Sequence, residues 1–231
     1  MAGWYIERSV LIQDNRNFIF HIFLVELKKE IGYLIIKKWL EAKNFKPFSF
    51  QLAAWQHIVK GESGLVNAPT GCGKTYSIFL GSIIEFINRH PITYKNKKNS
   101  GLHLLWITPL RALAKDIGRA MEEVIDELGM QWKVAIRNGD TSTADRTKQK
   151  AQMPEVLIIT PESLHLLLAQ KNYPSIFSSL KIIAVDEWHE LLGSKRGVQV
   201  ELAISRIVGS HESTITTNHL QASIWGISAT I

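Results

Sequence analysis

The sequence predicts an α/β fold in which a mostly parallel sheet is covered by helices on both faces. Two observations lead to this prediction. Short apolar runs of strand length recur along the chain, and longer segments with helical patterning separate them. Strands that alternate with helices form parallel sheets, and the crossovers between them are right-handed.

The individual elements follow from this pattern. We expect strands at residues 65–66, 102–107, 133–136, 156–159, 182–185 and 224–227. We expect helices at residues 49–60, 75–89, 110–128, 161–170 and 198–208. The run 182–185 reads Ile-Ile-Ala-Val and has no polar residue, which is typical of a strand buried on both faces of a parallel sheet.

Residues 68–75 read Ala-Pro-Thr-Gly-Cys-Gly-Lys-Thr, between an expected strand and an expected helix. This arrangement indicates a phosphate-binding loop, although Ala68 stands where the strict pattern has glycine. Glycines permit positive φ and let backbone N–H groups approach phosphate, and the helix adds its N-terminal partial charge. An ordinary glycine-rich turn is the alternative. The candidate nucleotide-binding residues are Thr70, Gly71, Cys72, Gly73, Lys74 and Thr75.

Asp186 and Glu187 follow the buried strand directly, at the edge where open α/β sheets bind ligands. Asp186 is the candidate Mg²⁺ ligand together with the Thr75 hydroxyl, and Glu187 is the candidate residue that orients an attacking water. A solvated acidic pair at a strand end is the alternative. The presence of Lys74, which would reach the β- and γ-phosphates of ATP, favours the catalytic interpretation.

Composition limits the partners and the compartment. A net charge of +6 favours a polyanionic partner such as nucleic acid, although a basic surface can also be merely soluble. Cys72 is the single cysteine, so the chain has no intramolecular disulfide and suits a reducing compartment, which predicts a cytoplasmic protein. The dense apolar run 18–27 is far too short to span a bilayer and is interpreted as a packing helix.

Together these motifs resemble those of superfamily 2 helicases of the DExH type. Residues 48–51 resemble the glutamine element that reads adenine, which gives Gln51 that role. Residues 108–114 resemble motif Ia, residues 160–164 resemble motif Ib, and residues 228–230 resemble motif III. In DExH relatives the histidine of the acidic motif, here His189, couples the ATP site to a second domain, and motif III, here Ser228 and Thr230, links hydrolysis to strand movement.

The segments 61–65, 138–142 and 186–197 are similar to the large helicase-related (Lhr) family, most of all to its bacterial ligase-associated members. This resemblance implies a RecA-like ATP-binding domain at residues 39–231. Residues 1–38 fall outside it and are either an added element, which we expect to be helical, or an over-extended gene start. It implies ATP and Mg²⁺ as cofactors. It also implies a motor that moves 3′ to 5′ on single-stranded DNA and unwinds tailed duplexes or RNA–DNA hybrids, in repair, with a functional link to a DNA ligase and a nuclease.

Motifs Ia and Ib are Thr-Pro turns that open helices just after strands, where backbone N–H groups can bind phosphate without reading sequence. The segment around Gly139 follows another strand and is a third candidate anchor. A lone Thr-Pro pair would be an ordinary helix start. The candidate nucleic-acid contacts are Pro109, Arg111, Gly139, Asp140, Thr160, Pro161 and Ser163.

Two other functions stay open from the sequence. One is an RNA helicase, against which His189 argues because the DEAD type has aspartate there. The other is a nucleotide-gated nucleic-acid-binding module without motor activity. The sequence ends one residue after motif III, whereas family members continue into a second RecA-like domain that carries arginine fingers. We therefore expect the chain by itself to be a monomer that hydrolyses ATP weakly or not at all.

Overall fold

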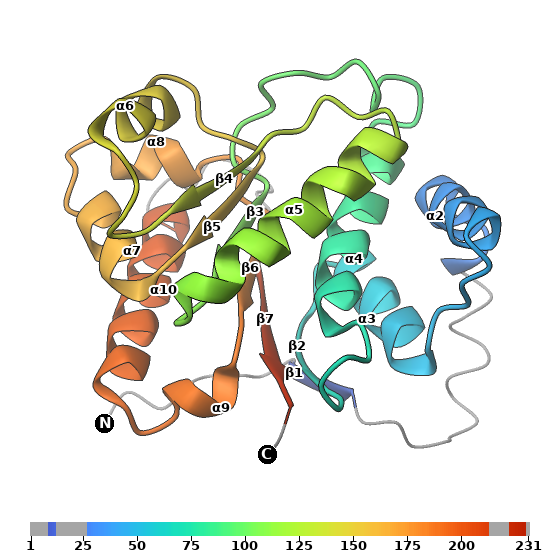
Figure 1. Cartoon of the computed structure of the whole chain (residues 1–231), viewed down its shortest axis with the longest axis horizontal. Helices are drawn as coiled ribbons and strands as arrows, with labels where there is room; N and C mark the ends of the chain where they lie inside the picture. Colours follow the sequence, from blue (N-terminus) through green and yellow to red (C-terminus); the bar gives the residue numbers. More distant parts are fainter. Residues whose placement is uncertain (1–8, 13–26, 213–221, 230–231) are drawn as a thin grey trace.

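The computed structural model describes residues 9–12, 27–212 and 222–229. The strands are β1 (Ser9–Ile12), β2 (Ser63–Asn67), β3 (Leu104–Ile107), β4 (Val134–Arg137), β5 (Val156–Ile159), β6 (Ile182–Val185) and β7 (Ser223–Ser228). The helices are α2 (Ile31–Ala42), α3 (Ser49–Val59), α4 (Lys74–Arg89), α5 (Arg111–Glu127), α6 (Thr143–Ala151), α7 (Pro161–Leu168), α8 (Tyr173–Phe177), α9 (Trp188–Leu191) and α10 (Lys195–Glu212). The predicted α/β fold is confirmed (Figure 1).

The strands form one sheet in the order β1-β2-β7-β6-β3-β5-β4, and every neighbouring pair is parallel. All carboxyl ends of the strands therefore lie at the same edge. Strands β2 and β6 flank β7 on one side of the sheet, while β3, β5 and β4 lie together on the other. This order decides which of the sequence motifs become neighbours.

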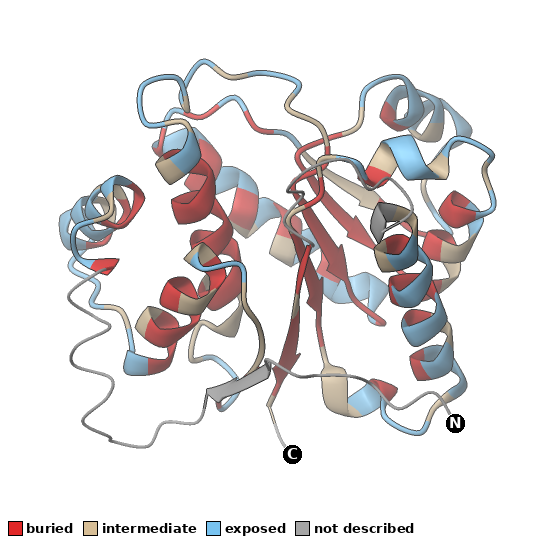
Figure 2. Cartoon of the chain, turned by 180° about the vertical axis from the view of Figure 1, so that it is seen from behind, coloured by how far each residue is buried: buried red, intermediate tan, exposed pale blue. Residues whose placement is uncertain are grey.

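Helices cover both faces of the sheet, as the sequence predicts. Successive strand side chains point to opposite faces, so Leu104 and Trp106 join a core with α3, α4 and α5, while Leu105 and Ile107 join a core with α7 and α10. Figure 2 shows the central strands buried, with the exposed residues on the outer surfaces of the helices and in the loops. Each fully buried side chain of this size contributes about 1.5–3 kcal/mol to the free energy of folding. The two cores therefore stabilise the sheet whose carboxyl edge carries the candidate site.

Most element boundaries agree with the predicted ones, and the differences have local causes. Strands β5 and β6 have the predicted ends. The strand predicted at 133–136 is shifted by one residue and ends at Arg137, because its register with β5 pairs Arg137 with Ile159. Helix α4 begins at Lys74, one residue before the predicted start, directly after Gly73, whose backbone is left-handed.

In the N-terminal extension the structure describes residues 9–12, which form a strand, and residues 27–38, which include the first turns of a helix. Helix α2 lies across the predicted boundary at residue 39 and packs on α4, where the N–H of Gly32 donates to Asn88 Oδ1 at 2.8 Å. Strand β1, which the sequence analysis did not identify, pairs in parallel with β2 at the edge of the sheet. The helix predicted at 18–27 lies almost wholly outside the described residues.

Candidate functional site

The candidate phosphate loop connects β2 to α4 at the carboxyl edge of the sheet. Gly71 and Gly73 have φ values of 82° and 74°, which only glycine adopts without strain. Ala68 is not in that region of φ; its N–H donates to Ser228 O at 3.3 Å and so continues the pairing of β2 with β7. The alanine that departs from the strict pattern therefore occupies a strand-like position, where glycine is not required.

Lys74 lies across this loop. Its ammonium donates to Ala68 O at 2.7 Å and to Pro69 O at 3.0 Å. Both acceptors are backbone carbonyls of the loop and neither is a carboxylate. The Lys74 ammonium therefore lies beside the N-terminus of α4. The β- and γ-phosphates of a nucleotide would bind at that place, where Lys74 and the first turn of α4 offer donors.

Gln51 connects helix α3 to the loop. Its side chain is 7% exposed; Oε1 accepts from the Phe48 N–H at 2.9 Å, and Nε2 donates to Gly73 O at 3.0 Å. The structure thus places the predicted adenine-reading residue directly against the phosphate loop, although they are 22 positions apart.

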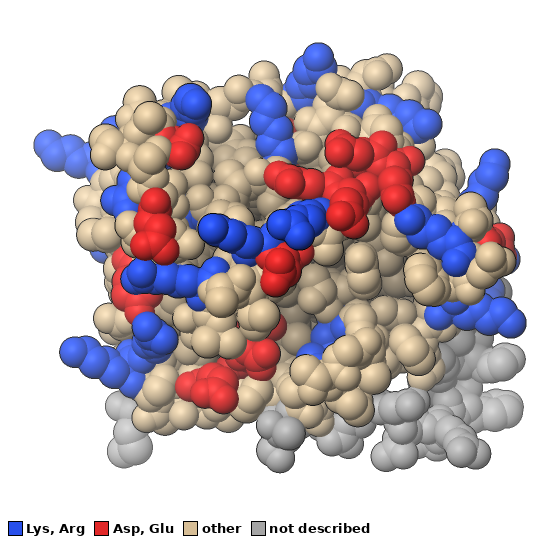
Figure 3. Space-filling model, viewed as in Figure 1, with Lys and Arg blue, Asp and Glu red and all other residues tan. Residues whose placement is uncertain are grey.

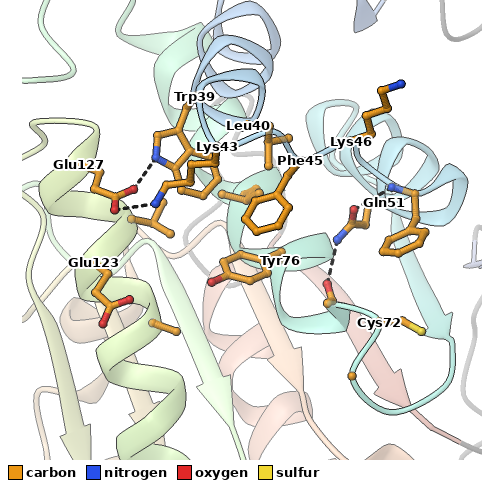
Figure 4. A pocket seen from close by; sticks show the side chains of 16 residues that line it. Trp39, Leu40, Lys43, Phe45, Lys46, Gln51, Cys72, Tyr76, Glu123 and Glu127 are labelled. Atoms are coloured by element: carbon orange, nitrogen blue, oxygen red, sulfur yellow. Dashed lines mark hydrogen bonds and ion pairs between the residues drawn. The ribbon is translucent and has the colours of Figure 1, made fainter.

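An apolar pocket of about 240 Å³ opens beside Gln51 and the loop. It is lined by Gly71 and Cys72 on the loop side and by the aromatic residues Trp39, Phe45, Phe48 and Tyr76. Figure 4 shows Phe45 and Tyr76 facing the space between α2 and the loop. Aromatic side chains of this kind can pack against the flat ring of a ligand such as a nucleobase. Sequence analysis placed Phe48 in the glutamine element but gave no role to the other aromatic residues. The available signal was that Phe45 and Tyr76 lie close to Gln51 and Lys74 in the sequence.

The far wall of the pocket joins α2 to α5 through Glu127. Trp39 Nε1 donates to Glu127 Oε2 at 2.7 Å, and Lys43 Nζ donates to Oε1 at 2.7 Å. These hydrogen bonds, from Lys43 first and then Trp39, hold the pKa of the Glu127 carboxyl below its usual value. Helix α2, which begins before the predicted domain boundary, is thereby part of the pocket.

The acidic pair lies where β6 ends. Asp186 is 8% exposed, and burial, followed by the charge of Glu187, raises its pKa from 3.8 to about 6. Its Oδ1 accepts from the Glu187 N–H at 3.0 Å. Glu187 has φ 49° and ψ 47°, a left-handed conformation that is strained for a residue with a side chain. A buried carboxylate with a raised pKa, next to a residue with a strained backbone, is typical of a functional site.

His189 links this pair to the end of β7. Its Nδ1 lies 3.1 Å from Ser228 Oγ and 3.5 Å from Glu187 Oε2, and its Nε2 lies 3.5 Å from Glu190 Oε1. The structure therefore brings together His189 and Ser228, two of the predicted coupling residues. Thr230, the third, lies outside the described residues.

The candidate nucleic-acid segments follow β3, β4 and β5, on the other half of the same edge. Arg111 is the first residue of α5, and its Nη1 lies 3.5 Å from Asp140 Oδ1; both side chains are more than half exposed. The guanidinium also lies over Gly139, where a Cβ atom would meet Nη2 at 2.9 Å. Arg111, Gly139 and Asp140 thus form one exposed group.

The motif Ib residues differ from this group in their exposure. At the start of α7 the motif Ib residues are buried, namely Thr160, Pro161 and Ser163. Their side chains therefore pack inside the turn and do not form its surface. Pro109 precedes α5 as predicted, in a turn where the Leu110 N–H donates to Thr108 Oγ1 at 3.4 Å. Among the predicted contact residues with side chains, Arg111 and Asp140 are therefore the exposed ones.

Charge along α5 runs against the helix dipole. Arg111 stands at the amino end, no basic residue lies in the last turn, and acidic residues occupy the last two turns. Figure 3 shows these acidic side chains gathered over the carboxyl-terminal half of α5. A cation at a helix N-terminus is unfavourable to the helix, so helix stability does not explain Arg111.

Comparison with known proteins agrees with this geometry. The chain belongs to the DEAD/DEAH box helicase family, whose model matches residues 48–231. It is 35% identical over 183 residues to the ATP-dependent helicase Lhr-Core of Methanocaldococcus jannaschii, covering 74% of this chain and 21% of that protein. It is 30% identical over 206 residues to the Lhr helicase/uracil glycosylase of Escherichia coli, covering 84% of this chain and 13% of that protein.

Among solved structures, helicase Lhr of Mycobacterium smegmatis, bound to single-stranded DNA and AMP-PNP, superimposes with a TM-score of 0.68 at 30% identity. The match covers 87% of this chain and 24% of that one. The predicted resemblance to the Lhr family and the RecA-like fold are confirmed. The fold is that of the RecA-like domain of a DEAD/DEAH box helicase, and the chain spans about a fifth of the length of the archaeal relative.

In the part of the chain that the structure describes, no helix is both long and apolar enough to cross a membrane.

Proposed function

We propose that this chain binds ATP with Mg²⁺ at the β2-β7-β6 half of the sheet edge and single-stranded DNA at the β3-β5-β4 half. In a full-length protein it would drive 3′ to 5′ movement on DNA, with duplex unwinding. The observation that carries the proposal is the sheet order, because it places the phosphate loop and the acidic pair on either side of β7 and gathers the exposed Arg111 group on the remaining strands.

The residues present fit a nucleotide with a divalent cation. Asp186 is a buried carboxylate whose raised pKa reflects a charge without full compensation, and Thr75 offers a hydroxyl in the first turn of α4. Both supply the hard oxygen ligands that Mg²⁺ prefers. When bound, Mg²⁺ would neutralise charge on the phosphates and so ease phosphoryl transfer.

Each residue then has a distinct task. Lys74 exchanges its loop carbonyls for phosphate oxygens, Gln51 and the aromatic pocket hold the base, and Glu187 orients the attacking water and accepts its proton. His189 contacts both Glu187 and Ser228, so a change at the water site can reach the end of β7. Arg111 holds backbone phosphate, which suits movement without base preference.

Binding measurements on the 231-residue chain test the proposal. Lys74→Ala should weaken binding of a fluorescent ATP analogue by at least about tenfold, because one charge-assisted contact contributes on the order of 1.5–3 kcal/mol. Lys98→Ala is the matched control, since Lys98 is an exposed lysine outside the site. Equal binding by both variants would contradict the nucleotide site.

The nucleic-acid preference needs its own comparison. We expect a fluorescent single-stranded DNA to bind more tightly than RNA of the same sequence. Tighter RNA binding would support an RNA helicase instead. Direction of movement and the link to a ligase and nuclease follow only from the resemblance; unwinding of duplexes with a 3′ or a 5′ tail by a full-length protein carrying this domain tests the direction.

A further inference from the structure

Arg137, the last residue of β4, carries a buried charge without a partner. Its side chain is 7% exposed, and its Nη1 is buried with no hydrogen bond. Within the described residues, the guanidinium contacts no carboxylate: burial, followed by the positive charge of Arg146, lowers its pKa from the usual value. An unpaired buried charge costs several kcal/mol, so folded proteins rarely keep one without a use.

Arg146 repeats the pattern from the facing helix α6. Its Nη2 donates to Asn138 O at 3.1 Å, while its Nε is buried without a partner. Two guanidinium groups thus lie close together, and each has an unused donor. Like charges repel, so an anion between them would relieve both the repulsion and the missing hydrogen bonds.

The place of this pair in the fold identifies the anion. Arg137 is in register with Ile159 of β5, and its carbonyl accepts from the N–H of Thr160 at 3.3 Å, so it lies at the motif Ib turn. The next residues along the chain lead into the Gly139–Asp140 turn, against which Arg111 lies. The pair therefore continues the proposed DNA-binding half of the sheet edge.

We propose that Arg137, with Arg146 beside it, binds a backbone phosphate of the nucleic-acid strand. The proposal rests on the proposed function and adds a contact that no sequence motif indicated. The planar fork of arginine matches phosphate oxygens, and two forks can hold one phosphate. Since little of Arg137 reaches the surface, the strand would enter as the Arg146 side chain leaves its single hydrogen bond to Asn138.

Arg137→Met tests this inference, because it removes the charge and keeps most of the volume. Affinity for a fluorescent oligo(dT) should fall several-fold, and the slope of log affinity against log salt should become shallower by about 0.7, the value for one phosphate on a single strand. Thermal unfolding of the free protein should be unchanged or shifted upward, since an unpaired buried charge is removed. Arg137→Lys, which keeps the charge, should restore most of the salt slope.

Arg119→Met is the matched control, since Arg119 is an exposed arginine on α5, and it should change neither quantity. An unchanged salt slope in Arg137→Met would overturn the inference while leaving the proposed function intact. A Met variant that unfolds or melts earlier would also overturn it, because the charge would then have a structural partner. Stabilisation by inorganic phosphate without any effect on oligo(dT) binding would make this an ion site only. Failure of the unsubstituted chain to bind oligo(dT) would instead remove the proposed function, and this inference with it.

Discussion

Ser228 contacts the ATP site from two sides. Its hydroxyl lies 3.1 Å from His189 Nδ1, and its carbonyl accepts from the N–H of Ala68, at the start of the phosphate loop, at 3.3 Å. Because β7 lies between β2 and β6, one residue at its end touches both the phosphate loop and the acidic motif. Ser228 thereby connects the candidate phosphate loop and the acidic motif to the end of β7.

Ser228→Ala should remove coupling without removing binding. The backbone bond to Ala68 remains, so affinities for ATP analogue and for single-stranded DNA, measured separately, should stay within about twofold. The change in DNA affinity on adding AMP-PNP should shrink, since coupling is a difference between two binding free energies. Equal coupling in Ser228→Ala and the unsubstituted chain would show that the hydroxyl is not part of the connection.

Glu187→Gln should separate binding from hydrolysis. The amide keeps the size of the side chain and leaves Asp186 and Lys74 in place, but it cannot accept a proton from water. We expect ATP and DNA affinities near those of the unsubstituted chain. In a longer protein that carries this domain together with a second RecA-like domain, hydrolysis should be at least a hundredfold slower, given that general bases contribute about 10²–10⁴-fold. Single-turnover assays with protein in excess detect slow hydrolysis; unchanged rates would exclude the assigned role.

The raised pKa of Asp186 predicts a pH-dependent effect on folding. In the unfolded chain this carboxyl loses its proton near pH 3.8, but in the folded chain only near pH 6, so ionisation of Asp186 destabilises the fold as pH rises through this range. Asp186→Asn should therefore be more stable than the unsubstituted chain above pH 6, by up to roughly 3 kcal/mol for a shift of this size.

Urea unfolding with EDTA from pH 4 to pH 8 measures this difference. As pH falls, the advantage of Asp186→Asn should decline below pH 6 and become small near pH 4, where the folded carboxyl is neutral and the unfolded one is only about half ionised. A constant difference across the range would show that the amide acts through packing or hydrogen bonding and not through the buried charge.

Asp140 and nucleic acid should compete for Arg111. Arg111→Ala should weaken single-stranded DNA binding about equally across sequences and make the salt slope shallower by about 0.7. Asp140→Asn frees the guanidinium from its carboxylate at 3.5 Å, so DNA affinity should rise about twofold to threefold, as expected for an exposed pair of about 0.2–1 kcal/mol. Binding of ATP analogue without DNA should be unaffected by either change. If Arg111→Ala lowers thermal stability and leaves the salt slope unchanged, the pair with Asp140 is only structural.

The sequence predicted the elements and motifs that depend on local pattern. The strand 182–185 and the phosphate loop have strong local signals, namely an unbroken apolar run and glycines at fixed spacing. The sequence predicted that Gln51 and Gly73 both bind nucleotide, but it did not predict the hydrogen bond between them. The unpaired charge of Arg137 had no signal, because it depends on burial between β4 and α6 and not on neighbouring residues. Strand β1 was missed because a serine followed by three apolar residues does not distinguish an edge strand from other short apolar runs.

The hydrogen bond from Trp39 to Glu127 ties the wall of the candidate base pocket to residues that lie before the family's motifs. The family model begins at residue 48, yet the pocket wall includes Trp39, Lys43 and Phe45. A chain that begins at residue 48 would keep every helicase motif named above but would lose one side of the pocket. The proper starting point for expressing this domain is therefore ahead of α2, at a position that sequence motifs alone would place outside it.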